Sequence, residues 1–166
     1  MTLAFVGLGS NLAHPRRRLA GALRTMARLP GTRLLAVSPN YASAPVGATQ
    51  PQPDYVNAVA LLRTRLRAGD LLRHLHGIER AHGRERVTGD RNAPRTLDLD
   101  LLLFGRLRMA TRHLALPHPR MHERAFVLKP LADLAPAARV PGHGVAQGLA
   151  RRVTGQRIAR TRSHAR

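Results

Sequence analysis

An alternation of leucine and aspartate over residues 97–104 constrains the fold more than any other stretch of this sequence. The segment reads Leu-Asp-Leu-Asp-Leu-Leu-Leu-Phe. Side chains at i and i+2 of a strand share a face, so the four odd-numbered leucines are predicted to face a core, and Asp98 and Asp100 the other side. Aspartate is disfavoured in strands and two like charges repel, so this pair needs a cation to stay ionised.

The cation can be Mg²⁺ or an arginine. Mg²⁺ takes oxygen ligands, commonly one or two carboxylates completed by water and phosphate oxygens. Just upstream, Arg91 and Arg95 lie in a turn that contains Pro94, and guanidinium groups pair bidentately with phosphates. These residues indicate a site for metal and phosphate. The alternative, a solvated strand face whose aspartates pair with arginines, stays open on spacing alone.

The length and composition favour one cytoplasmic domain. A chain of 166 residues can bury a core of its own, and we expect one domain over residues 1–145 followed by a flexible, arginine-rich tail over residues 146–166. The sequence has no cysteine, which suits a reducing compartment. It has neither a basic signal-peptide start nor an apolar run near the ~20 residues of a membrane span, so we expect no membrane partner.

The formal net charge of +19 would ordinarily suggest a nucleic-acid partner. Lys129 is the only lysine among 28 basic residues, and arginines occur on every segment. This preference is typical of a coding bias that spreads charge over the whole surface. We therefore interpret most arginines as solvated and expect an anionic small molecule as the partner.

Hydrophobic periodicity predicts strands over residues 3–9, 34–38, 55–62 and 97–104. Helices are expected over residues 15–29, 69–82 and 120–128, the last ending before Pro130. The order strand, helix, strand, strand, helix, strand is typical of a split βαβ arrangement. We therefore expect an α+β fold with a ferredoxin-like core, a mostly antiparallel sheet with packed helices, in three αβα layers with additions.

Three common motifs are incomplete. Gly7 and Gly9 begin a dinucleotide loop, but Leu12 stands where the third glycine is needed. No glycine-rich segment ends in Lys-Ser or Lys-Thr, which excludes a P-loop. His122 and Glu123 begin a zincin motif, but position 126 is phenylalanine instead of histidine.

The strand predicted over residues 55–62 places Tyr55 and Asn57 on one face. An aromatic ring there can stack on a flat heterocycle, and the neighbouring amide can hydrogen-bond to the edge of that heterocycle. The alternative from the residues alone is an exposed edge-strand tyrosine beside a solvated asparagine.

The run from Arg91 to Leu102 resembles the signature of the 6-hydroxymethyl-7,8-dihydropterin pyrophosphokinase family, an arginine and Ala-Pro-Arg turn before an Asp-x-Asp strand. Three further segments match in order, at residues 9–12, 52–58 and 116–126, so the resemblance spans roughly residues 1–140. It implies a ferredoxin-like enzyme of folate biosynthesis (class EC 2.7.6.3). Such an enzyme transfers pyrophosphate from ATP to the hydroxymethyl oxygen of the pterin and releases AMP.

The same resemblance implies roles for individual residues. It makes Asp98 and Asp100 the ligands of two Mg²⁺ ions and, with Arg84 and Arg95, the catalytic residues. Predicted ATP-binding residues are Glu79, Arg84, Arg91, Arg95, His118 and Arg124, of which His118 and the arginines would neutralise phosphate oxygens. Predicted pterin-binding residues are Asn11, Ser43, Ala44, Val46, Tyr55, Asn57 and Phe126. The chain departs from the best-known members at Asn92, where they carry tryptophan, and at His113, where some carry arginine. We expect a monomer.

A ferredoxin-like nucleic-acid-binding module is the alternative from another functional class. Such a module stacks bases on exposed aromatic side chains, and this chain has only five, Phe5, Tyr41, Tyr55, Phe104 and Phe126. It would also leave two aspartates facing a polyanion. Nucleic acid is therefore the less favoured partner.

Overall fold

The computed structural model describes residues 1–83 and 96–162. Within these ranges the elements follow one another as β1 (Thr2–Ser10), α1 (Pro15–Met26), β2 (Thr32–Val37), β3 (Tyr41–Ser43), β4 (Tyr55–Thr64), α2 (Ala68–Ala81), β5 (Asp98–Phe104), β6 (Met109–Ala110), β7 (Ala115–Leu116), the 3₁₀ helix η1 (Met121–Glu123), α3 (Ala125–Leu134), β8 (Arg139–Val140), β9 (Gly144–Val145), α4 (Ala146–Arg152) and β10 (Ile158–Arg160).

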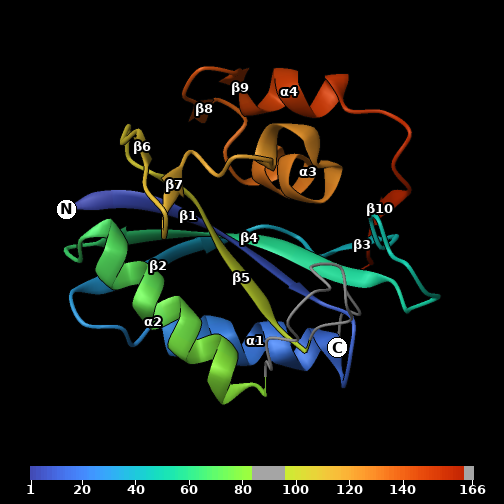
Figure 1. Ribbon diagram of the computed structural model, residues 1–166, viewed down its shortest axis with the longest axis horizontal. Helices are drawn as coiled ribbons and strands as arrows, with labels where there is room; N and C mark the ends of the chain where they lie inside the picture. Colours follow the sequence, from blue (N-terminus) through green and yellow to red (C-terminus); the bar gives the residue numbers. More distant parts are fainter. Residues whose placement is uncertain (84–95, 163–166) are drawn as a thin grey trace.

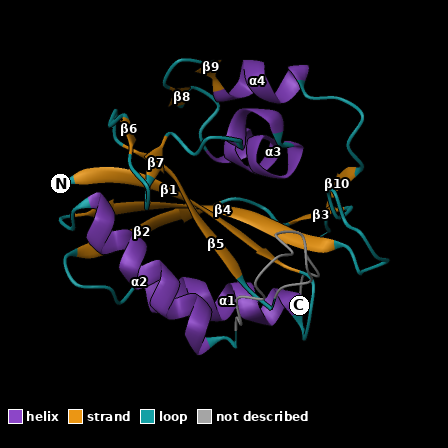
Figure 2. Cartoon of the chain, in the orientation of Figure 1, coloured by secondary structure: helices purple, strands orange, loops and turns teal. Residues whose placement is uncertain are grey.

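The main sheet of the described chain has six strands in the order β10-β3-β4-β1-β5, with β2 also paired to β4, and every pairing is antiparallel. Strands β2 and β3 follow each other along the same edge of β4. Helices α1 and α2 cover one face of this sheet, and α3 and α4 lie over the other (Figures 1 and 2). The prediction of a mostly antiparallel sheet with packed helices in three layers is confirmed at this level.

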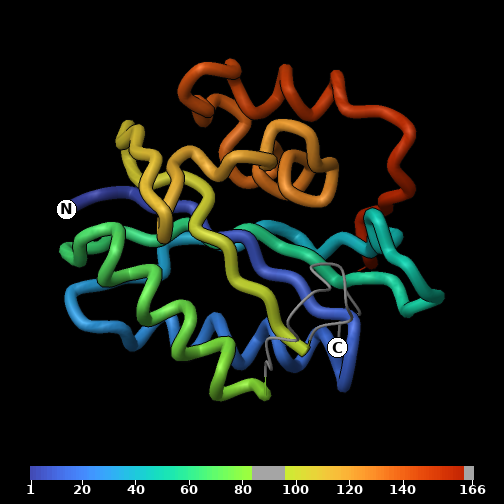
Figure 3. Tube along the Cα trace, viewed as in Figure 1, coloured from blue at the N-terminus to red at the C-terminus, as the bar shows by residue number. Residues whose placement is uncertain are grey.

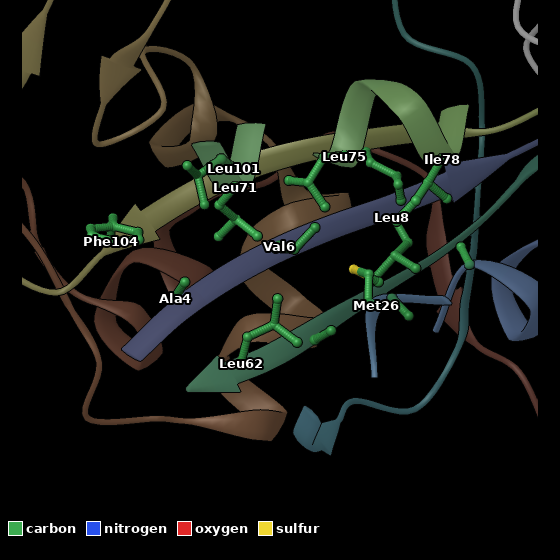
Figure 4. Packing of buried hydrophobic residues seen from close by; sticks show 14 of the residues in the cluster. Ala4, Val6, Leu8, Met26, Leu62, Leu71, Leu75, Ile78, Leu101 and Phe104 are labelled. Atoms are coloured by element: carbon green, nitrogen blue, oxygen red, sulfur yellow. The ribbon is translucent and has the colours of Figure 1, made fainter. Parts of the chain in front are cut away.

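One hydrophobic core lies between the sheet and helices α1 and α2. Figure 4 shows Leu71 and Leu75 of α2 packed over Val6 of β1, with Met26 of α1 and Leu62 of β4 beside them. These five side chains are fully buried. Apolar residues at helical spacing in α1 and α2 therefore meet alternate residues of the strands, as the periodicity of both kinds of element requires.

A second core lies on the opposite face, under α3 and α4. It joins Val59 of β4 to Leu128 and Leu131 of α3 and to Leu149 of α4. Because β4 gives Val59 to this core and its neighbour Ala60 to the other, both faces of the strand are covered. A strand with both faces covered shows a continuous apolar run instead of an alternation, which the sequence of β4 has.

Strand β5 departs from regular alternation near its end. Its register with β1 shifts between the pairs Leu101↔Val6 and Leu103↔Phe5, so Leu102 is an extra, bulged residue. A bulge reverses which face the following residues occupy. Leu97, Leu99 and Leu101 are in the first core as predicted, but the prediction for Leu103 was wrong, because this residue packs in the second core.

The third helix continues past the proline that was expected to stop it. Helix α3 begins at Ala125 and ends at Leu134, with Pro130 buried inside it. A proline within a helix removes one backbone hydrogen bond. Burial of Val127, Leu128 and Leu131 on the same helix offsets that loss, which the local sequence argument could not include.

The arginine-rich segment from residue 146, expected to be flexible, contains regular structure. Residues 146–152 form α4, which packs on α3, and residues 158–160 form β10, which pairs with β3. Figures 1 and 3 show the chain leaving α4 and running down one end of the molecule to β10, which lies beside β3. Composition misled here, because Leu149 packs in the second core and the backbone of β10 pairs with β3 whatever its side chains are.

Across residues 1–83 and 96–162, none of the helices has both the length and the apolar character that a bilayer crossing requires.

Candidate active site

Two glycines of β1 separate the aspartates of β5 from the polar end of β4. The register pairs Gly9 with Asn57 on one side and with Asp98 on the other, and it pairs Gly7 with Val59 and Asp100. Residues directly opposite each other in antiparallel strands project from the same face. Asp98, Asp100 and Asn57 therefore share the α3 side of the sheet, across a strip of main chain that has no side chains.

Two side chains of β4 lie close to the backbone of Gly9. A Cβ atom at Gly9 would lie 3.2 Å from Oδ1 of Asn57 and 3.8 Å from Cδ1 of Tyr55. Glycine is thus the residue that leaves these two side chains in place. The sequence alone assigned Gly7 and Gly9 to an incomplete dinucleotide motif and Gly9 to a segment that resembles the family, but not this spacing role, which depends on the strands that lie on either side.

The predicted metal ligands Asp98 and Asp100 are both partly exposed and point the same way, as the alternation predicted. His118 lies beside the same strand, where its backbone N–H donates a hydrogen bond of 2.9 Å to the carbonyl oxygen of Leu102. Asp98 and Arg124 both act electrostatically on the imidazole of His118. The fold thus gathers two carboxylates, one imidazole and one guanidinium at one end of the sheet.

His118 is uncharged near neutral pH. The pKa of its imidazole is lowered to about 4, chiefly by burial and also by the charges of Arg124 and Arg120, while the charge of Asp98 opposes this shift. The backbone N–H of Arg120 donates to Nδ1 at 3.3 Å, so the proton of the neutral ring is on Nε2. The neutral ring can therefore donate a hydrogen bond from Nε2 to a phosphate oxygen, and the part of His118 in ATP binding stays a prediction.

A pocket of about 300 Å³ lies along β5, the last strand of the sheet. Predicted residues Asp100, Glu79 and His118 line it together. Glu79 is 2% exposed, and its Oε2 accepts a hydrogen bond of 3.3 Å from the backbone N–H of Leu99. The acidic strand, the second helix and the segment after β6 therefore form one concave site.

The same pocket contains residues that sequence reasoning did not assign. They are Leu72 and His76 of α2, Leu99 and Leu101 of β5, and Thr111, Arg112, Leu114, Ala115 and Pro119 of the following segment. His113, noted only as a departure from the family, also lines it. The sequence could have indicated His76, because it stands three residues before the predicted ATP-binding residue Glu79 and thus lies on the same helix face.

The predicted pterin residues form two connected groups. Nδ2 of Asn57 donates a hydrogen bond of 2.7 Å to Oγ of Ser43, and both residues are buried. Nδ2 of Asn11 donates to Oε1 of Gln52 at 2.7 Å and to the carbonyl oxygen of Pro53 at 3.1 Å. The first bond joins the segments that precede and follow the loop over residues 44–54, and the other two attach Asn11 to the end of that loop.

The remaining predicted residues differ in placement. The guanidinium carbon of Arg124 lies 5.5 Å from the ring centroid of Phe126. Ala44 is partly exposed and Val46 is 50% exposed. Arg84, Arg91 and Arg95, together with Asn92, lie outside the residues that the structure describes.

The family model for 7,8-dihydro-6-hydroxymethylpterin-pyrophosphokinase (HPPK) matches residues 5–136. A 2-amino-4-hydroxy-6-hydroxymethyldihydropteridine pyrophosphokinase from Pseudomonas aeruginosa is 53% identical over 137 residues, which are 82% of this chain and 83% of that protein. This chain belongs to the HPPK family. Proteins of the same name from Haemophilus influenzae and Methylorubrum extorquens are 44% and 40% identical over 81% and 91% of the chain, and over 82% and 94% of their own lengths.

Solved structures show the same HPPK fold. The crystal structure of Plasmodium falciparum HPPK-DHPS wild type with pteroate superimposes with a TM-score of 0.71 at 11% identity. The match covers 91% of this chain and 42% of that longer chain. All of these relatives are named as pyrophosphokinases or HPPK, so nothing in the comparisons supports the nucleic-acid-binding alternative.

Proposed function

We propose that this chain transfers the pyrophosphoryl group of ATP to 6-hydroxymethyl-7,8-dihydropterin, giving the pterin diphosphate and AMP, in folate biosynthesis. Membership of the HPPK family gives the reaction class. The observation that carries the proposal is the placement of Asp98 and Asp100 across Gly9 and Gly7 from the buried amide of Asn57. The two carboxylates and the amide thus lie on one face of the sheet, on either side of Gly7 and Gly9.

In this reaction the hydroxymethyl oxygen attacks the β-phosphorus of ATP, and AMP leaves with the bridging oxygen. The transferring group carries high negative charge, so the protein contributes mainly positioning and charge stabilisation. Asp98 and Asp100 suit the metal of such a site, because Mg²⁺ prefers carboxylate oxygens and takes its other ligands from water and phosphate. Among residues 1–83 and 96–162, no group of three or more His, Cys, Asp or Glu side chains lies close enough together to hold a metal ion.

We propose that Asp98 and Asp100 hold two Mg²⁺ ions. When bound, these would lower the pKa of the attacking hydroxyl and spread the charge of the phosphate oxygens. Arg124 supplies a fixed positive charge beside His118, whose Nε2–H donates to a phosphate oxygen as a neutral group. Arg84, Arg91 and Arg95 are proposed as further phosphate ligands on the basis of the family signature alone.

The nucleotide is proposed to occupy the pocket along β5. Apolar side chains of α2 and β5 form part of its lining, and polar side chains such as His76 and Thr111 form the rest, which suits a purine that needs both apolar contact and hydrogen bonds. Asp100 and His118 are at the same pocket, so a nucleotide there would present its phosphates to both. Glu79 is proposed to act from its buried position against Leu99.

The pterin is proposed to lie on the strip at Gly9. The amide of Asn57, held by Ser43, and the amide of Asn11 would meet its polar edge, together with backbone groups of residues 43–46, including Ala44 and Val46. Tyr55 and Phe126 are proposed to enclose its ring. The core of β5-β1-β4-β2 with α1 and α2 is proposed to be ferredoxin-like, and the cytoplasmic location and monomeric state stay predictions.

The test is AMP formation from ATP and Mg²⁺, with and without the pterin alcohol. We expect AMP only when the alcohol is present, and none with a dihydropterin that lacks the hydroxyl group. Asp98→Asn and Asp100→Asn should each lower turnover by about 100-fold or more, the scale for loss of a charge-stabilising group. Asp70→Asn, at an exposed carboxylate of α2 paired with Arg73, is the matched control and should keep full activity.

Two results would contradict the proposal. Absence of pterin-dependent AMP would reject the function. Normal turnover by both the Asp98 and Asp100 variants, with the Asp70 control also active, would reject the metal site while leaving the reaction in place.

A further inference from the structure

Six consecutive residues near the end of the described chain, Gln156–Thr161, bridge the two segments that carry the proposed pterin residues. One segment holds Arg124 and Phe126, at the start of α3. The other holds Ser43 at the end of β3 and Tyr55 at the start of β4. Both segments are far from Gln156 in sequence, and the bridge forms because the chain returns from α4 to β3 (Figure 3).

The side chain of Gln156 binds the backbone on both sides of Arg124. Its Oε1 accepts a hydrogen bond of 2.9 Å from the N–H of Ala125, and its Nε2 donates one of 2.8 Å to the carbonyl oxygen of Glu123. The N–H of Ala125 is one of the first in α3, a helix without a capping side chain at its own N-cap residue. Gln156 supplies that cap from a distant part of the chain.

The next residue binds the other segment. Arg157 makes two hydrogen bonds of 2.7 Å to Asp54, one to each carboxylate oxygen, and Asp54 immediately precedes Tyr55. The carbonyl oxygen of Arg157 accepts a hydrogen bond of 3.0 Å from the N–H of Ala44. A bidentate pair of this kind fixes direction as well as distance.

Strand β10 continues the attachment along β3. Ile158 pairs with Ser43 and Arg160 with Tyr41, and the N–H of Thr161 donates to the carbonyl oxygen of Asn40 at 2.9 Å. Ser43 is the residue that holds the amide of Asn57. The bridge is therefore attached at one end to the start of α3, near Phe126, and at the other end to Ser43, which binds the amide of Asn57.

We propose that Gln156 and Arg157 are positioning residues that set the separation of the two sides of the pterin site. The inference rests on the proposed function, since it takes Tyr55, Asn57 and Phe126 as pterin contacts. Two adjacent residues hold the two sides through their side chains, so the separation of the two sides depends on one short stretch of chain. Neither residue touches the substrate in this proposal.

The variants that test it are Gln156→Leu and Arg157→Met, which keep much of the side-chain volume and remove the hydrogen bonds. The measurement is equilibrium binding of the pterin alcohol, with a non-hydrolysable ATP analogue present, and separately of the ATP analogue alone. We expect pterin affinity to fall roughly tenfold in each variant, the scale of one or two lost hydrogen bonds. ATP-analogue affinity should change by less than about twofold. Arg162→Gln, at an exposed position of the same segment, should leave both affinities unchanged.

Reversing the ion pair between Asp54 and Arg157 distinguishes a positioning role from an effect on the stability of the whole fold. Asp54→Arg and Arg157→Asp should each weaken pterin binding, and the two together should recover most of it. Unchanged pterin affinity in Gln156→Leu and Arg157→Met, or equal loss of both ligands together with a lower melting temperature, would overturn the inference. A wild-type chain that binds no pterin would instead reject the proposed function and this inference with it.

Discussion

At the scale of single residues, the absence of a side chain at Gly9 matters as much as the presence of the aspartates. Gly9 lies between Asn57 and Asp98 in the register of three strands. Gly9 is not among the glycines of the described chain that have a positive φ angle, so its backbone conformation does not require glycine. Space is the remaining reason, because a Cβ atom would crowd the amide of Asn57.

Gly9→Ala is accordingly expected to weaken pterin binding by about tenfold or more, because the added Cβ would stand 3.2 Å from Oδ1 of Asn57. Gly7→Ala is the matched control two residues earlier. Its nearest neighbour would be the side chain of Leu102 at 3.4 Å, an ordinary contact, so a change below about threefold is expected. Pterin titration of both variants checks this, and equal losses would show that Asn57 is not the reason.

At the scale of elements, β3 pairs with a strand on each of its edges and is hydrogen-bonded to helix α3. It pairs with β4 and β10, and the hydroxyl of Tyr41 donates a hydrogen bond to the carboxylate of Asp133 on α3. Burial raises the pKa of Tyr41 to about 12, and the hydrogen bond and charge of Asp133 act in the same direction. The folded state therefore favours the protonated phenol.

This linkage predicts how Tyr41→Phe changes stability with pH. At pH 8 the variant should lose about 1 kcal/mol of unfolding free energy with the hydrogen bond. The folded pKa lies above the unfolded value of 10.0, so the stabilisation is complete below pH 10 and is lost as pH rises toward 12. Urea unfolding at pH 8 and pH 11 should show the gap between the two proteins closing, and a constant gap would contradict the assignment.

The elements also show what local sequence could and could not predict. Strands β1, β4 and β5 were predicted within about two residues, because each has a run or an alternation of apolar residues longer than a turn. Strands β3 and β10 were not, because each has three residues and gains its stability from partners distant in the chain. The faces of Asp98 and Asp100 followed from alternation alone, while the bulge at Leu102 depends on the pairing with β1.

At the scale of the whole molecule, one sheet supports two cores that share their strands. Leu71 on α2 and Leu128 on α3 are both fully buried, in different cores. Strand β4 contributes side chains to both cores, so unfolding of either core would disturb a strand on which the other core packs. The prediction of a single domain accordingly implies one cooperative unit over both cores.

Leu71→Ala and Leu128→Ala test this at matched positions, since both remove the same atoms from fully buried sites. Each is expected to lower the free energy of unfolding by about 2–5 kcal/mol. In calorimetry each variant should show one transition at a lower temperature, as expected of a small two-state domain. A second transition that only one variant moves would mean that the two cores unfold separately.

The lack of a side chain at Gly9 also bears on resistance to inhibitors. A compound that rests flat on the strip at Gly9 would gain contacts from main-chain atoms, which no substitution can delete. The simplest escape mutation would add a side chain at Gly9 to push the compound away. If the pterin lies there as proposed, the same side chain would obstruct the natural substrate, so a protein that evaded the drug in this way would also lose the reaction it needs.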